Sequence, residues 1–145
     1  MNRIMMFLAL VAGCAGDGSL GVRDEAAGTE RRIEFDREFT MAVNEIVAVG
    51  DTPVLIFFDR VDGDSRCPAG VTCVWEGNAA VRLEFSSQIA EFAPQARVLN
   101  TSLEPRSVSM LGVTVRLVDV APYPEASGPP IDPGSYVVRL VASRS

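Results

Sequence analysis

From position 32 onward, apolar and polar residues alternate along most of the chain, as they do in half-buried β-strands. The first alternating segment runs from Ile33 to Val43, and a short apolar run follows at residues 46–49. Residues 54–58 (VLIFF) are continuously apolar. Such a run predicts a central strand that is covered on both faces or that lies where two sheets cross.

The longest regular alternation covers residues 73–85. We expect one face of this strand to point inward, with the small residues Gly77 and Ala79 leaving room for the Trp75 indole or a crossing strand. The inward set is Cys73, Trp75, Gly77, Ala79, Val81, Leu83 and Phe85.

Three further strands are expected, one of them weak, at residues 95–99. The other two have inward faces made of Leu111, Val113, Val115 and Leu117, and of Tyr136, Val138, Leu140 and Ala142. Five prolines at positions 122–134 predict a long loop before the last strand. No helix is expected after the first thirteen residues. Six to eight strands joined by Gly- and Pro-containing turns predict an all-β fold, an antiparallel β-sandwich or barrel forming a single domain over residues 32–145.

The amino-terminal segment has a different pattern. Arg3 precedes an apolar run from Ile4 to Ala12, which is too short to span a bilayer but fits the apolar region of an export signal. The following Val11-Ala12-Gly13-Cys14 resembles the lipobox of bacterial lipoproteins. This resemblance implies cleavage before Cys14, a diacylglyceryl group on its thiol and an acylated amino terminus. The alternative is an ordinary secretory signal cut elsewhere, for instance after Ala15.

The lipobox resemblance divides the chain into a signal peptide (1–13), a flexible tether (14–31) and the β domain. The tether is rich in glycine and acidic residues and has almost no large apolar side chain, so it is not expected to fold. We therefore expect a lipid-anchored protein of the cell envelope. Position 15 is Ala rather than Asp, which by resemblance to enteric sorting favours the outer membrane.

The charge of the chain narrows the range of partners. The formal net charge is −6, with 13 basic and 19 acidic residues, and all of the basic residues are arginine. An acidic chain without a basic cluster is not expected to bind nucleic acid. The expected partners are the membrane, through the lipid, and a protein or glycan that the sequence does not identify.

The chain has three cysteines. If Cys14 carries lipid, Cys67 and Cys73 remain as a pair, and in an oxidising compartment they are expected to form a disulfide. The alternative is a redox pair, but five residues separate the two cysteines and no helix is expected to follow, unlike in C-x-x-C motifs.

Residues 64–81 read DSRCPAGVTCVWEGNAAV. This stretch resembles a motif of small exported bacterial proteins of unknown function, approximately D-S-R-C-P-x-x-V-x-C-x-W-x-G-x-A-x-V. The resemblance implies a compact β domain, often on a lipoprotein, and no substrate. The matching positions are Asp64, Ser65, Arg66, Cys67, Pro68, Val71, Cys73, Trp75, Gly77, Ala79 and Val81.

We interpret this motif as structural. The disulfide would pin an irregular loop to the first residue of a strand at Cys73, and Val71 would pack inward. Asp64 and Arg66 would pair across the loop or cap its main-chain amides. The alternative is a ligand site formed by Asp64, Arg66 and Glu76 at the mouth of the loop.

Several kinds of chemistry are disfavoured by composition. The chain has no histidine and no lysine, which excludes histidine-dependent triads and lysine nucleophiles and disfavours zinc, copper and iron sites. No phosphate-binding glycine motif is present, and no cofactor is expected. Asp59, Asp62 and Asp64 are weak candidates for calcium ligands, and a solvated acidic turn is the alternative.

Taken together, the sequence predicts a non-enzymatic lipoprotein that serves as a binding or structural module. One alternative is an inhibitor of secreted hydrolases that uses residues 63–72 and 122–134 as contacts. Another is an adhesion module that depends on calcium or carbohydrate.

Overall fold

A computed structural model describes residues 30–89 and 91–145, and in this part of the chain it is all-β, with nine strands and one 3-10 turn, η1 (Pro133–Ser135). The predicted signal peptide, Cys14 and all of the predicted tether except residues 30 and 31 lie outside the described residues. The strands are β1 (Arg31–Ile33), β2 (Glu38–Ala42), β3 (Ile46–Val49), β4 (Val54–Asp64), β5 (Ala79–Ser87), β6 (Gln95–Asn100), β7 (Ser107–Met110), β8 (Val113–Ala121) and β9 (Val137–Arg144).

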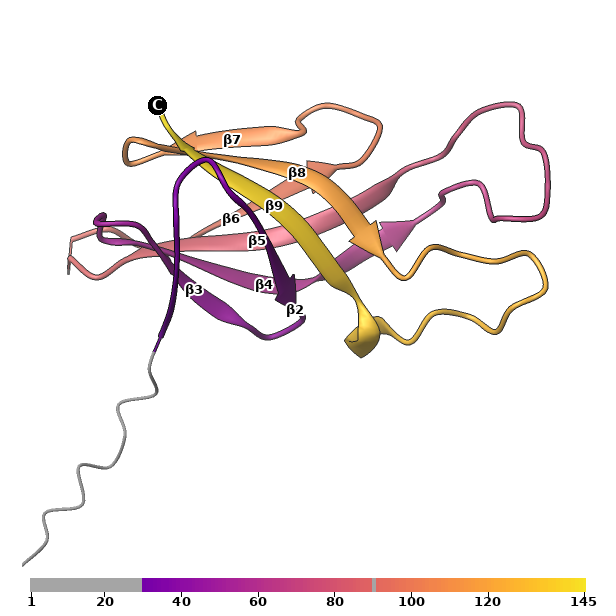
Figure 1. The fold of residues 1–145 in the computed structure, drawn as a ribbon, viewed down its shortest axis with the longest axis horizontal. Helices are drawn as coiled ribbons and strands as arrows, with labels where there is room; N and C mark the ends of the chain where they lie inside the picture. Colours follow the sequence, from indigo (N-terminus) through magenta and orange to yellow (C-terminus); the bar gives the residue numbers. More distant parts are fainter. Residues whose placement is uncertain (1–29, 90) are drawn as a thin grey trace, which may run out of the picture.

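The strands form two sheets that pack face to face (Figure 1). The first sheet has the order β1-β3-β4-β5-β6, and the second has the order β2-β9-β8-β7. Every strand pair is antiparallel except β1 with β3, which is parallel. The expectation of an antiparallel β-sandwich is therefore confirmed, with one parallel pair at its edge.

Alternate side chains of both sheets fill the space between them. Val54, Ile56 and Phe58 of β4 are fully buried, and the intervening Leu55 and Phe57 are half-buried. The predicted inward positions of β5, β8 and β9 are buried too, which confirms the strand register there. They are Ala79, Val81, Leu83, Phe85, Val113, Val115, Leu117, Val138, Leu140 and Ala142, and Tyr136, which directly precedes β9, is buried as well.

Residues 33–43 form two strands rather than the single strand that the alternation predicted. The chain turns at Asp36, where φ is +58° and the main-chain N–H donates to the carbonyl of Ala142 at 2.8 Å. This corner carries the chain from the first sheet to the second. As a result Ile33 and Met41 both enter the core, each from a different layer.

Two other expectations about strands were wrong. Leu111 is 46% exposed and lies with Gly112 in the tight turn between β7 and β8, where both residues have positive φ. The strand β7 itself was not predicted, because Ser107–Met110 is short, lies at a sheet edge and buries no side chain fully.

The antiparallel order places the connections β4–β5, β6–β7 and β8–β9 at the same end of the sandwich (Figure 1). The described chain begins at the other end. Glu30 accepts a hydrogen bond from Gln88, just after the end of β5, at 3.0 Å. Within residues 30–89 and 91–145, no helix has the length and apolarity needed to cross a membrane.

Candidate functional site

The β4–β5 connection, residues 65–78, contains the cysteine–tryptophan motif. Its two arms continue the β4–β5 pairing, because Ser65 N–H donates to Asn78 O and Cys67 N–H donates to Glu76 O, both at 2.8 Å. The expected Cys67–Cys73 disulfide is present, with a Cα–Cα distance of 5.9 Å. The disulfide therefore closes the tip of the loop, and the two main-chain hydrogen bonds join its arms at the base.

Gly77 is required by the close approach of these two arms. Its φ is +74°, and a Cβ at this position would lie 1.9 Å from the carbonyl oxygen of Ser65. The space that Gly77 leaves is therefore taken by the backbone of Ser65 and Arg66 and not by the Trp75 indole.

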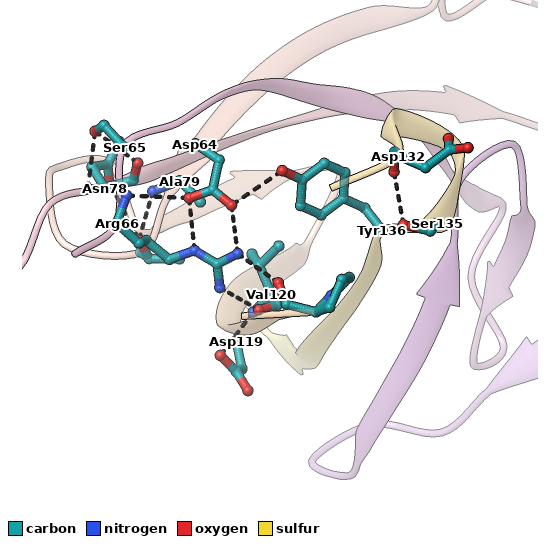
Figure 2. A network of polar contacts seen from close by, with 12 residues as sticks. Asp64, Ser65, Arg66, Asn78, Ala79, Asp119, Val120, Asp132, Ser135 and Tyr136 are labelled. Carbon is teal, nitrogen blue, oxygen red and sulfur yellow. Dashed lines mark hydrogen bonds and ion pairs between the residues drawn. The ribbon is translucent and has the colours of Figure 1, made fainter. Parts of the chain in front are cut away.

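Beneath the loop, Arg66 and Asp64 form a buried ion pair, with 5% and 8% of their side chains exposed (Figure 2). Arg66 donates from Nε to one Asp64 oxygen at 2.8 Å and from Nη2 to the other at 2.6 Å. Its remaining N–H groups donate to the carbonyl oxygens of Val120 and Pro122. Because Asp64 ends β4 while Val120 belongs to β8, this ion pair joins the two sheets.

Tyr136 completes the contacts of Asp64. Its hydroxyl donates to the second Asp64 oxygen at 3.1 Å, and the Arg66 main-chain N–H donates to the first at 3.2 Å (Figure 2). The sequence prediction that Asp64 pairs with Arg66 or caps main-chain amides is confirmed, since it does both.

The electrostatics of this group follow from burial and pairing. Burial acts to raise the pKa of Asp64, but the hydrogen bonds and charge of Arg66 outweigh it, so this pKa lies below its ordinary value. For Tyr136, burial and the nearby Asp64 carboxylate raise the pKa. Asp64 is therefore ionised and Tyr136 protonated at neutral pH.

A second buried polar group fixes the β6–β7 connection, residues 101–106. Asn78 donates to the Asn100 side chain at 2.8 Å, and its own amide oxygen accepts from Ser102 N–H at 3.1 Å. Asn100 and Asn78 are 9% and 8% exposed. The 101–106 connection is thus held against the start of β5 by these side chains and by one main-chain hydrogen bond, from Thr101 N–H to Ala79 O at 3.1 Å.

The long β8–β9 connection, residues 122–136, is joined directly to the disulfide loop. Ala69 N–H donates to the carbonyl of Pro124 at 2.9 Å, and Ala126 N–H donates to the carbonyl of Ala69 at 3.1 Å. This short parallel bridge links segments that lie more than fifty positions apart. It also explains how a proline-rich loop without strands keeps a defined shape.

Large apolar side chains are exposed on these same connections. Among the described residues, five of the eight exposed large hydrophobic side chains belong to the three connections, and Val74 is fully exposed. We call residues 65–78, 101–106 and 122–136 together the loop platform. Its exposed apolar side chains are Val71, Val74, Trp75, Leu103 and Tyr123.

The expectations that Val71, Cys73 and Trp75 pack inward were wrong. Val71 and Trp75 are 51% and 53% exposed, Cys73 is exposed too, and β5 begins at Ala79 rather than at Cys73. The disulfide therefore closes the tip of a loop and does not pin that loop to the first residue of a strand. The positive φ of Gly77 breaks the alternation on which the prediction depended.

Several clefts open beside the platform, and two of them contain residues of the buried ion pair. One, of about 210 Å³, is lined by Arg66, Glu76 and Tyr123 together with Thr101, Ser102, Val118 and Asp119, so all three connections contribute to it. The Arg66 guanidinium lies 4.8 Å from the centre of the Tyr123 ring. The other cleft, of about 350 Å³, lies under the proline-rich connection, with Asp64 and Tyr136 among its lining residues.

Of the three residues of the alternative ligand site, Arg66 and Glu76 line the 210 Å³ cleft, whereas Asp64 lines the 350 Å³ cleft. The Asp64 and Arg66 side chains are nearly enclosed and bonded to each other and to the main chain, while Glu76 is exposed. Pro68 is half-buried in the loop. The sequence identified the residues that shape this end of the molecule, and it missed Asn78, Asn100 and Tyr136 as their partners.

The side chains of the candidate calcium ligands form ion pairs with arginines. Asp59 pairs with Arg60 at 2.6 Å, and Asp62 pairs with both Arg60 and Arg82, while Asp64 is held by Arg66. Within the part of the chain that the structure describes, no group of three or more His, Cys, Asp or Glu side chains could hold a metal ion.

Comparisons of the chain with protein-family models, with curated proteins and with solved structures found no match. The resemblances to the lipobox and to the cysteine–tryptophan motif therefore stay predictions.

Proposed function

We propose that this protein is a lipid-anchored protein of the cell envelope and that its loop platform is a non-enzymatic binding surface for another protein. The observation that carries the proposal is the concentration of exposed apolar side chains on the platform. Exposed large apolar residues that occur singly are ordinary, whereas a set gathered on adjoining loops is typical of interaction sites.

The fixed geometry of the platform supports this function. A buried ion pair lies below it, a disulfide closes the tip of one loop, and two main-chain hydrogen bonds join that loop to its neighbour. A surface that is ordered before it meets its partner loses less conformational entropy on binding. Trp75 and Tyr123 also belong to the residue types that dominate the energetics of protein interfaces.

The place where the described residues begin supports a platform that faces away from the anchor. Glu30 contacts Gln88 at one end of β5, and the disulfide loop joins the other end. A strand of nine residues is roughly 30 Å long. A tether from Cys14 would therefore join the domain at the end opposite the platform, which suits a platform that meets its partner away from the membrane.

The buried polar groups support a structural role rather than catalysis. Arg66 and Asp64 use their hydrogen-bonding groups on each other, on Tyr136 and on the carbonyls of Val120 and Pro122. A group engaged in this way would have to break existing contacts before it could act on a substrate.

The lipid anchor is tested by labelling the native bacterium with a palmitate analogue and comparing the wild type with Cys14→Ala. Label is expected on the wild type alone, with the variant released from the membrane fraction. Equal labelling of the two chains, or a wild type that is not membrane-associated, would contradict the anchor.

The binding surface is tested with a photo-crosslinking amino acid placed at Val74 on the platform or, as a control, at Ile89 at the opposite end. Both positions are exposed, so neither replacement is expected to disturb the fold. We expect discrete protein adducts from position 74 that disappear when Trp75→Ala is added, and none from position 89. Equal patterns from both positions would contradict the proposed function.

A second candidate, inhibition of a secreted hydrolase, is favoured by one observation. The tip of the loop, residues 67–75 with the disulfide ring at 67–73, is fixed at its base, and its residues 69–75 are exposed. A loop that enters an enzyme cleft without being rearranged needs both properties. The purified chain, tested in excess against a panel of secreted proteases and glycosidases, would inhibit at least one of them. Full activity of every enzyme would exclude this candidate for the panel.

A further inference from the structure

The charged residues of the loop platform, considered together with its apolar residues, indicate the chemistry of its partner. The three connections carry four acidic residues, namely Glu76, Glu104, Glu125 and Asp132. Against these they carry two arginines. One of them, Arg66, is buried and neutralised by Asp64, so Arg106 is the one exposed arginine of the platform.

Glu76 and Glu125 are placed beside the exposed aromatic residues. Glu76 follows Trp75 directly and lines the 210 Å³ cleft together with Tyr123. Glu125 lies two residues after Tyr123 on the connection that bonds to Ala69. In the described part of the chain, no arginine lies within ion-pair distance of either carboxylate, although nine such pairs occur elsewhere on the domain.

We propose that the loop platform binds a segment of a partner protein in which lysine or arginine residues flank apolar ones. This inference rests on the proposed binding function and adds the chemistry of the partner. The apolar residues of the segment pack on Val74 and Trp75, and its cations lie against Glu76 and Glu125. Charge complementarity of this kind increases the rate of association and rejects partners of the wrong sign.

A basic protein segment fits this surface better than an anionic membrane does. Lipid headgroups of negative charge would meet Glu76, Glu125 and a chain of net charge −6, which is repulsive. A purely apolar partner would leave the two carboxylates without a counter-charge at the edge of the contact. A basic and apolar segment satisfies both features of the platform.

Trp75 provides a direct reporter, because it is the one tryptophan of the chain and is half-exposed on the platform. The full chain would be titrated with three synthetic peptides that lack tryptophan. The first combines arginine with leucine, the second replaces each arginine by glutamate, and the third replaces each leucine by serine. The emission of Trp75 and its quenching by acrylamide are measured at low and at high salt.

The expected result is that the arginine–leucine peptide alone shifts the Trp75 emission and protects the indole from acrylamide, and that high salt weakens this binding. Binding of the glutamate peptide with equal affinity, or equal binding of the serine peptide, would overturn the proposal. Protection of Trp75 by anionic lipid vesicles and by no peptide would also overturn it, in favour of a membrane surface.

Variants then test the carboxylates. The double variant Glu76→Gln, Glu125→Gln is expected to weaken binding by about 2- to 30-fold, in keeping with two exposed ion pairs. A matched double variant, Glu34→Gln and Glu84→Gln, lies outside the platform and is expected to bind as the wild type does. Equal effects of the two double variants would contradict the assigned contacts.

Failure of this inference is distinguishable from failure of the proposed function. If adducts form at position 74 in cells but the arginine–leucine peptide is not preferred, the binding surface is supported and a basic partner is rejected. If no adducts form and no peptide is preferred, both the binding surface and the basic partner are rejected.

Discussion

The base and the tip of the disulfide loop are built in opposite ways, although they lie within ten residues of each other. At the base, Arg66 is charged yet only 6% exposed, and it bonds to Asp64, to the carbonyl oxygen of Val120 in β8 and to that of Pro122 just after β8. At the tip, Trp75 is apolar yet 53% exposed. Polar residues thus stabilise the inside of this region while apolar residues face water.

Buried polar residues therefore hold the loop in place, while exposed apolar residues remain available to contact a partner. A buried ion pair contributes little net stability compared with apolar packing, but its loss leaves a charge without a partner. A half-exposed tryptophan adds less to folding than a buried one and is a typical anchor of an interface. The comparison therefore predicts large stability effects at the base and small ones at the tip.

The largest effect is expected for Arg66→Met, which leaves the buried Asp64 carboxylate unpaired. We expect the free energy of unfolding to fall by about 3–5 kcal/mol, measured by urea denaturation. The control is Arg82→Met, whose partner Asp62 is part-exposed, and its expected loss is much smaller than that of Arg66→Met. Equal losses in the two variants would remove the distinction between the base and the surface.

Gly77→Ala is expected to be nearly as damaging, at about 2–5 kcal/mol, because the new Cβ meets the Ser65 carbonyl and the backbone has positive φ. Gly70→Ala is the matched control, since Gly70 also has positive φ (+91°) but open space around it. Its expected cost is about 1–2 kcal/mol. If Gly70→Ala were the more destabilising variant, close contact of the two arms would be the wrong explanation.

Replacing both Cys67 and Cys73 by serine is expected to lower the free energy of unfolding by about 2–2.5 kcal/mol, the loop-entropy value for a ring of seven residues. Urea denaturation of the double variant beside the oxidised wild type measures this. Because the base of the loop has its own contacts, the rest of the domain is expected to keep its near-ultraviolet circular dichroism. Loss of that signal would show that the tip and the base are not independent.

Acidification tests the base without mutation. The pKa of Asp64 is lower in the folded chain than its ordinary value of 3.8, so the stability from this carboxylate is complete above that value. It is lost progressively as the pH falls below 3.8 and through the lower folded pKa. Carbon-13 NMR of the Asp64 carboxyl is expected to give a midpoint below 3.8, and a midpoint above it would contradict the pairing.

The smallest effect is expected at the tip. Trp75→Ala is expected to change the free energy of unfolding by less than about 0.5 kcal/mol while abolishing the proposed peptide binding. Phe58→Ala in the core provides the contrast, with an expected loss of about 3–5 kcal/mol. A Trp75→Ala chain as unstable as Phe58→Ala would place the indole in the core after all.

The sequence predicted the fold class and most strands, because burial of one face leaves a period of two that is readable at β5, β8 and β9. The strand prediction was wrong where the alternation of apolar and polar residues continues through a change of backbone direction. Residues 33–43 keep the pattern across the corner at Asp36, and residues 73–78 keep it across the positive φ of Gly77. Periodicity reports which residues alternate, and it does not report where the chain leaves its sheet.

The candidate site was predicted in part for a similar physical reason. Asp64 and Arg66 are two positions apart, so their pairing is a local matter that the motif indicates. Their contacts with Tyr136, Val120 and Pro122 depend on the packing of one sheet on the other, which no local pattern contains. The exposure of Trp75 likewise follows from where β5 begins, and the sequence placed that start six residues too early.

The two hydrogen bonds that Ala69 makes with Pro124 and Ala126 have a consequence for the lengths of two distant loops. A residue added to or removed from either connection would shift one side of this bridge against the other, so their lengths have to change together. The turn at Leu111 and Gly112 is joined by one main-chain hydrogen bond to Ser145, at the end of the chain, and Gly112 has open space around it. That turn is the natural position for inserting a tag or a fluorescent probe while leaving the far end of the domain unaltered.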